Sequence, residues 1–155
     1  MVFKNEKELE RFLLKKSRLA LLKAQDKVYE IIKKFLYEYY HDYDPSVYDR
    51  TYQLLRSLVE SRIVTDGKGY KAEVYFNVDS LNYVTGGMPS GEQVMDAAIK
   101  GLHGAIGDIP KSDKQFKYMA GNTGVNIWGD PMQELNAKAI NILKQMLISE
   151  GIPIK

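Results

Sequence analysis

The sequence predicts an α+β fold in which a long N-terminal helix and a C-terminal helix pack on a small antiparallel sheet. Three observations support this prediction. The first proline is Pro45 and the first glycine is Gly67, so neither breaks a helix across residues 5–40. Apolar and polar residues alternate over 72–78, as in a half-buried strand. A second helical apolar stripe follows Asp130. With 155 residues, the chain is predicted to form one domain, residues 1–155.

The composition argues against membrane-spanning, secreted and disulfide-bonded proteins. Apolar residues make up 45% and charged residues 27%, as in ordinary soluble proteins. No apolar run is long enough to span a membrane, and the charged first residues do not resemble a secretory signal. The chain has no cysteine, which excludes disulfides and thiol nucleophiles and fits synthesis in a reducing cytoplasm. Its net charge of +2 is too small to indicate nucleic-acid binding by itself.

The first helix, predicted over 5–40 within an N-terminal segment 1–40, is long for this chain. Thirty-six residues span roughly 54 Å at about 1.5 Å each, whereas a compact domain of this size is roughly 39 Å across. The helix therefore either bends near Lys16, where its apolar stripe is interrupted, or projects beyond the globule. A projecting arm would expose Phe12 and Leu13 for contact with a partner.

Several shorter elements are predicted between the two helices. Pro45 ends the first helix, and a second is expected from about Ser46 to Glu60 after a tyrosine-rich turn. A turn at 66–69 indicates a hairpin. Ser90 and Gln93 have the spacing of a capping box, which predicts a helix that runs to Leu102.

Residues 103–129 are predicted to form an extended contact loop. Five glycines interrupt the segment, yet it retains the aromatic side chains of Phe116, Tyr118 and Trp128. It either contains a strand pair, at about 116–119 and 125–128, or is ordered by contact with neighbouring proteins. In the helix that follows, Asp130 is expected to cap, Pro131 to take the first helical position, and Gly151 to end the helix.

The sequence offers no catalytic, cofactor-binding or metal-binding constellation. His41 lies near Asp42 and Asp44, but carboxylates beside a histidine at a helix end are more often caps than metal ligands. His103 is expected at a helix terminus, where the helix dipole favours a cation. No nucleophile elbow or phosphate-binding loop occurs. A hydrolase that uses scattered carboxylates remains an alternative, although no pair of them is singled out.

The run from Tyr43 to Leu58, YDPSVYDRTYQLLRSL, resembles a segment of the head–tail joining, or tail-completion, proteins of tailed bacteriophages. In that family a long N-terminal helix ends in a tyrosine-rich turn with a Tyr-x-Arg-Thr pattern, followed by a hairpin. The resemblance covers about residues 5–80, and the loop at 103–129 departs from it. It implies fold-organising roles for Tyr48, Arg50, Thr51, Leu54 and Ser57.

The resemblance implies a non-enzymatic structural protein of the virion neck. Copies of the chain would form a ring between the portal-associated adaptor and the tail-tube protein, with no cofactor and no membrane contact. Such a ring needs two different faces on each subunit. The candidate interface residues are Phe12, Leu13, Tyr40, Tyr43, Tyr48, Arg50, Phe116, Tyr118 and Trp128.

DNA that passes through the ring lumen would meet basic residues of the first helix, with weak, salt-dependent contact. The candidates are Lys15, Lys16, Arg18 and Lys23. The alternative function is a nucleic-acid-binding accessory protein that uses this basic helix directly. Residues 1–40 carry ten Lys/Arg against six Asp/Glu, which is a mild excess. Arg50 has two interpretations, as the organiser of a corner between helices or as an inter-subunit contact.

Overall fold

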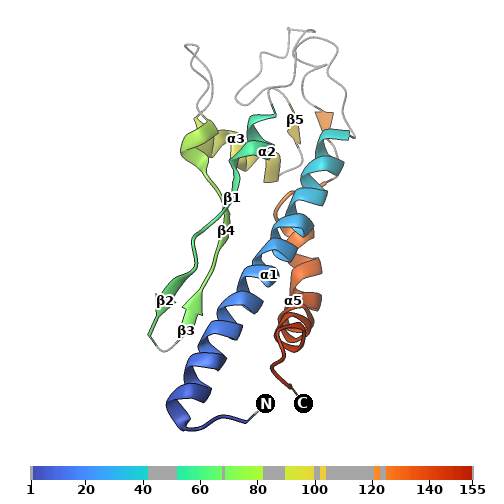
Figure 1. Cartoon of the computed structure of the whole chain (residues 1–155). Coiled ribbons are helices and arrows are strands. Elements are labelled where there is room, and N and C mark those ends of the chain that lie inside the picture. The colour runs from blue at the N-terminus through green and yellow to red at the C-terminus, as the bar shows by residue number, and fades with distance from the viewer. Residues whose placement is uncertain are drawn as a thin grey trace, which may run out of the picture.

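The computed structural model describes residues 2–41, 52–67, 69–81, 90–99, 102–103, 121–122 and 125–154. Two helices dominate it: α1 (Glu6–His41) and α5 (Gly129–Ser149). They lie side by side and antiparallel, so both chain termini lie at the same end of the molecule (Figure 1). Small antiparallel two-stranded sheets accompany them. The predicted α+β fold class is confirmed.

The α1 helix is continuous past Lys16, where the apolar stripe is interrupted. Figure 1 shows no sharp bend at this level of the helix. The interruption has a different cause, since Lys16 forms an ion pair with Glu150 just beyond the C-terminal end of α5. The turns of α1 that precede Lys16 therefore lie beyond the C-terminal end of α5.

The hairpin is a ribbon built from two consecutive strand pairs. β1 (Leu58–Glu60) pairs with β4 (Val74–Phe76), and β2 (Val64–Asp66) pairs with β3 (Gly69–Lys71), both antiparallel. The register changes by one residue between the two pairs, because residues 61–63 lie opposite only residues 72–73. This extra residue is a bulge, which bends the strand and increases its twist.

The second helix is shorter than predicted. α2 (Gln53–Ser57) ends where β1 begins, and residues 46–51 lie outside the described residues. In a continued helix, the Ser61 amide would donate to the Ser57 carbonyl. Instead, the Ser57 carbonyl accepts from the Asn77 amide at 2.7 Å, and the Ser61 amide donates to the Glu73 carbonyl at 2.8 Å. Strand pairing thus takes the backbone groups that the helix would have used.

The helix α3 (Gly91–Ile99) begins with the predicted capping box. The Gln93 amide donates to Ser90 Oγ at 3.3 Å, and the Ser90 amide donates to Gln93 Oε1 at 2.8 Å. The prediction that this helix reaches Leu102 is wrong, because β5 (Leu102–His103) pairs with β6 (Gly121–Asn122). His103 therefore lies in a strand and not at a helix terminus.

The sequence predicts the C-terminal end of α5 correctly but its N-terminal cap wrongly. Its N-terminal amides are capped by Asn126, whose Oδ1 accepts from the amides of Trp128 and Gly129 at 3.1 and 2.7 Å. Asp130, the predicted cap, instead accepts the Asn126 amide at 2.8 Å. At the other end Gly151 has φ +85° and forms the predicted left-handed termination, in which the Ile152 amide donates to the Leu147 carbonyl at 3.0 Å.

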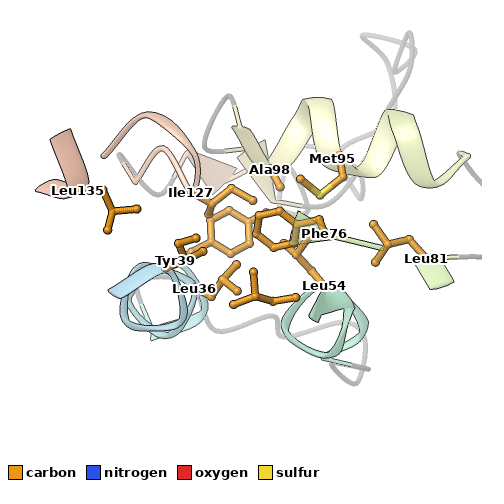
Figure 2. Packing of buried hydrophobic residues seen from close by; sticks show 11 residues of the cluster. Leu36, Tyr39, Leu54, Phe76, Leu81, Met95, Ala98, Ile127 and Leu135 are labelled. Atoms are coloured by element: carbon orange, nitrogen blue, oxygen red, sulfur yellow. The ribbon is translucent and has the colours of Figure 1, made fainter. Parts of the chain in front are cut away.

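The hydrophobic core lies at one end of the helix pair, which we call the core end. Figure 2 shows the packing of its side chains. There, the C-terminal half of α1 and the first turns of α5 meet α2, α3, the β1–β4 pair and the 3₁₀ helix η1 (Val78–Leu81). Ile127, within the predicted contact loop, is fully buried in this core. The core residues are Ile32, Leu36, Tyr39, Leu54, Leu58, Phe76, Leu81, Met95, Ala98, Ile127 and Leu135.

Candidate interaction surface

The opposite end of the helix pair, here the terminal end, comprises residues 6–19 of α1 and 136–149 of α5. Both helices are described in full, and neither has a buried residue within these stretches. Large apolar side chains are nevertheless frequent there, and Ile140 is 72% exposed. Exposed apolar side chains that gather at one end of a molecule are candidates for contact with another protein. The exposed apolar residues at and next to this end are Leu9, Leu13, Leu14, Leu19, Leu22, Ile140, Leu143 and Ile148.

The two predicted interface residues of the N-terminal arm differ in accessibility. Leu13 is 38% exposed and lies in the stretch of α1 that extends beyond α5. Phe12 is half-buried, because Phe3 folds back and packs on it with ring centroids 5.2 Å apart. The segment that precedes α1 thus covers part of the arm and leaves Leu13 available for contact.

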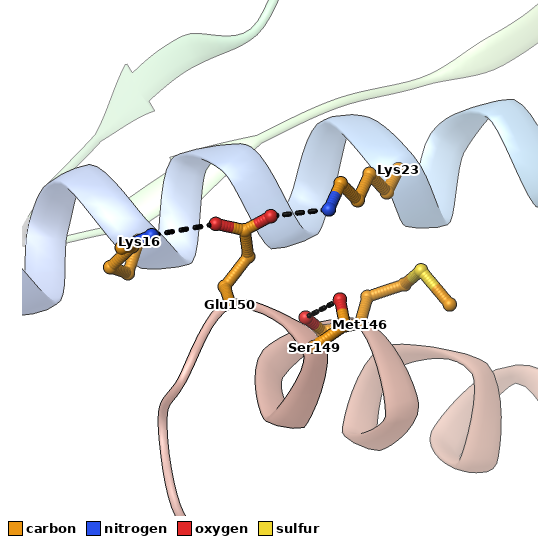
Figure 3. A network of polar contacts seen from close by, with 5 residues as sticks. All are labelled: Lys16, Lys23, Met146, Ser149 and Glu150. Carbon is orange, nitrogen blue, oxygen red and sulfur yellow. Dashed lines mark hydrogen bonds and ion pairs between the residues drawn. The ribbon is translucent and has the colours of Figure 1, made fainter.

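A carboxylate fixes the C-terminal end of α5 to α1 (Figure 3). Glu150 is paired through one oxygen with Lys16, at 3.0 Å, and through the other with Lys23. Its side chain is only 9% exposed. Hydrogen bonds from Lys23 and Lys16 hold the pKa of the Glu150 carboxyl below its usual value. Two of the four basic residues proposed to face DNA are therefore engaged inside the chain.

The other two basic residues line a groove at the terminal end, between α1 and the tip of the ribbon. Arg11, Lys15 and Arg18 supply three positive charges on successive turns of α1. Leu14, Leu19 and Tyr70 complete the lining of a cavity of about 390 Å³. Among the residues that the structure describes, no carboxylate forms an ion pair with these three cations. We call this site the cationic groove.

A group of three carboxylates lies farther along the helix pair, where Asp26 and Glu30 of α1 meet Glu60 of β1. Burial raises the pKa of the Glu60 carboxyl, and so do the negative charge of Asp26 and a hydrogen bond with it. Lys33 lies 3.5 Å from Glu30 and neutralises part of this charge. We call these three residues the acidic cluster. Within the described part of the chain, no group of His, Cys, Asp or Glu side chains has an arrangement suited to a metal ion.

Gln25 was not singled out from the sequence, yet it attaches the ribbon to α1. Its side-chain amide donates to the Ser61 carbonyl at 3.0 Å and to the Glu73 carbonyl at 2.9 Å. The Glu73 amide in turn donates to Ser61 Oγ at 2.8 Å, next to the bulge. The sequence signal is the position of Gln25 among Leu21, Val28 and Ile32 at helical spacing. A polar side chain on such a stripe becomes buried, and buried polar side chains are usually hydrogen-bonded.

The remaining predicted interface residues lie at the core end or outside the described residues. Tyr40 is half-buried and packs on Tyr52 with ring centroids 5.0 Å apart. Trp128 is 41% exposed and lies 6.3 Å from Phe76, between their ring centroids. The structure therefore does not bring these two together with Phe12 and Leu13. The predicted residues outside the description are Tyr43, Tyr48, Arg50, Phe116 and Tyr118.

None of the described helices combines the length and apolar character needed to cross a membrane.

Comparison with known proteins gives a family match. No curated protein and no solved structure is detectably similar to the chain. The model of one protein family, YomN, matches residues 5–149, which include both long helices and the ribbon between them. The chain therefore belongs to the YomN family.

Proposed function

We propose that the chain is a non-catalytic structural protein that assembles through its terminal end into a ring at the neck of a tailed bacteriophage. The assembly part of this proposal rests on the apolar surface of α1 and α5. The neck is proposed from the resemblance of the Tyr43–Leu58 run to head–tail joining proteins. The partners are copies of the chain together with the portal-associated adaptor and the tail-tube protein.

The observation that carries the proposal is the exposure of apolar side chains where the helix pair leaves the core. Leu9 and Leu13 are exposed on the turns of α1 that precede Lys16. Ile140 and Leu143 are exposed on two successive turns of α5. Burial of such side chains stabilises an interface by roughly 25 cal/mol for each Å² of apolar surface. This surface therefore favours association with another protein.

The nucleic-acid alternative is less favoured by the charges. Lys16 and Lys23 are paired with Glu150, which leaves four basic residues within residues 6–23 of α1: Lys7, Arg11, Lys15 and Arg18. Each phosphate contact contributes to the salt dependence of DNA binding, so four contacts predict only weak binding. Electrophoretic mobility of duplex DNA at low salt separates the two functions, because a strong retardation would favour the accessory-protein reading.

The assembly part is tested by the mass of the purified protein across a concentration series. We expect wild type to form a closed oligomer of more than two copies, visible as rings by electron microscopy. The variant Leu13→Asp/Ile140→Asp should remain smaller. Tyr37→Asp is the matched control, since Tyr37 is an exposed apolar residue at the core end of α1. An equal loss of assembly in the control would contradict the role of the terminal end.

The neck location is tested by gold-labelled antibody against the chain on purified phage particles from the producing host. We expect label at the junction between head and tail. Label along the tail shaft or on the capsid would refute the location, as would its absence from particles while the chain is abundant in the cell.

A further inference from the structure

The face of α1 beside the ribbon carries charges of opposite sign at two levels. Arg11, Lys15 and Arg18 are spaced by four and three residues, so they form one stripe of the cationic groove, roughly 10.5 Å long. Asp26 and Glu30 lie two to three turns farther along the helix and belong to the acidic cluster with Glu60. The two charged sites lie apart along α1.

Apolar residues separate the two charged sites. Lys15, Leu19, Leu22 and Asp26 follow one another in steps of four, three and four residues, which places them along one face of the helix. Leu19 and Leu22 are both exposed. This order of cation, apolar residue and anion is the pattern of an interface with a central apolar strip and charged margins.

Each charged site is unfavourable in the isolated chain. The three cations of the groove repel one another, and no described carboxylate pairs with them. In the acidic cluster, carboxylates likewise lie beside one another, with Lys33 as a partial counter-charge. Complementary charges on neighbouring molecules would relieve each of the two sites.

Building on the proposed function, we propose that the occupant of the cationic groove is the acidic cluster of a second copy of this chain. Lys15 and Arg18 of one copy meet Asp26 and Glu60 of the next, and Leu19 and Leu22 pack between the copies. The offset from Lys15 to Asp26 is eleven residues, or roughly 16 Å along the helix. The groove and the cluster are two different sites of each copy. A head-to-tail contact uses one site of each copy and leaves the other site for the next copy, as a ring requires.

Charge reversal with complementation tests this contact. One variant, Lys15→Glu/Arg18→Glu, reverses the groove, and the other, Asp26→Lys/Glu60→Lys, reverses the cluster. Each alone should raise the concentration needed for self-association at least tenfold. In an equimolar mixture, each groove can meet a cluster of opposite charge on a copy of the other variant, so self-association should return with the two variants in alternation. A chain with all four changes should assemble as wild type does.

The control is Lys27→Glu/Arg56→Glu, which reverses two exposed basic residues outside both charged sites and outside the terminal end. This variant should assemble normally. Circular dichroism verifies that every variant is folded. If one variant assembles weakly because its fold is disturbed, the mixture still tests the contact.

Unchanged assembly of both reversed variants would overturn the contact while leaving a ring built through other residues intact. A wild type that stops at two copies would overturn the head-to-tail arrangement. A wild type that never self-associates would also overturn it, whereas the neck location depends on the antibody label alone.

Discussion

The core end and the terminal end are built from the same two helices, yet they differ in what covers them. At the core end α1 and α5 meet α2, α3 and the β1–β4 pair, and side chains such as Leu36 are fully buried. At the terminal end neither helix buries a residue completely. The difference indicates that the core end stabilises the fold and that the terminal end is left free for another function.

The largest expected effect is a contrast in stability between the two ends. Leu36→Ala removes a fully buried side chain and should lower the free energy of unfolding by about 2–5 kcal/mol. Ile140→Ala, at the terminal end, should change it by less than about 0.5 kcal/mol. Urea unfolding followed by circular dichroism measures both. Similar losses would show that the terminal end is part of the stabilising core.

Gly91→Ala tests the close packing of the core end. A Cβ at this position would lie 2.2 Å from the Val78 carbonyl oxygen, so the backbone must move. We expect a loss of about 2–3 kcal/mol in the free energy of unfolding, near the top of the usual range for overpacking. Gly69→Ala is the matched control, because its Cβ would meet only the Asp66 carbonyl at an ordinary 3.8 Å. Equal unfolding midpoints for the two variants would argue against the contact of α3 with η1.

Gln25→Met tests the attachment of the ribbon between the two ends. The substitution keeps the length of the side chain but removes both hydrogen bonds to the strand carbonyls. We expect a loss of about 1–2 kcal/mol in unfolding free energy, with faster amide exchange at Ser61 and Glu73. Lys27→Met, on the same helix, should do neither. Unchanged exchange at the bulge would mean that Gln25 does not hold the ribbon.

Glu60→Gln should have the smallest effect, and its sign follows from the raised pKa. The folded chain holds the Glu60 proton more tightly than the unfolded chain does, so the Glu60 contribution to stability increases as pH falls through that raised pKa. Above it, the ionised Glu60 slightly destabilises the fold. The variant should therefore be slightly more stable than wild type at pH 7. Its advantage should shrink below the raised pKa, as followed by thermal melts at several pH values.

Glu150 has the opposite pH dependence, so the pH test must compare each variant with wild type. Its pKa is lowered by Lys23 and Lys16, and its contribution is present above the ordinary carboxyl pKa and lost as pH falls through the lowered one. A Glu60→Gln advantage that grows on acidification would contradict the assigned direction.

The features predicted correctly from the sequence are those with local signals. The apolar stripe of α1, the Ser90–Gln93 capping box and the termination at Gly151 each depend on residues within a few positions of one another. The start of β1 depends instead on Asn77, twenty residues beyond Ser57. Local helix propensity therefore extended the second helix too far, because strand pairing at long range overrides it.

For the surface, the length of α1 predicted either a bend near Lys16 or an arm with Leu13 exposed. The helix is continuous past Lys16 and Leu13 is 38% exposed, and the role of Leu13 in an interface stays a prediction. The pairing of Lys16 and Lys23 with Glu150 joins residues more than 120 positions apart, and no local pattern indicates it. The cationic groove likewise depends on the fold, which brings Tyr70 beside α1. The tyrosine-rich turn and most of the 103–129 segment lie outside the described residues, so their predicted roles stay predictions.

Amide hydrogen exchange of the protein, measured free and in its assembled form, tests the central claim most directly. If the terminal end is the assembly surface, assembly should slow exchange in residues 6–19 and 136–149 and leave residues 32–39 unchanged. Slower exchange confined to the core end, or no change at the terminal end upon assembly, would contradict the account.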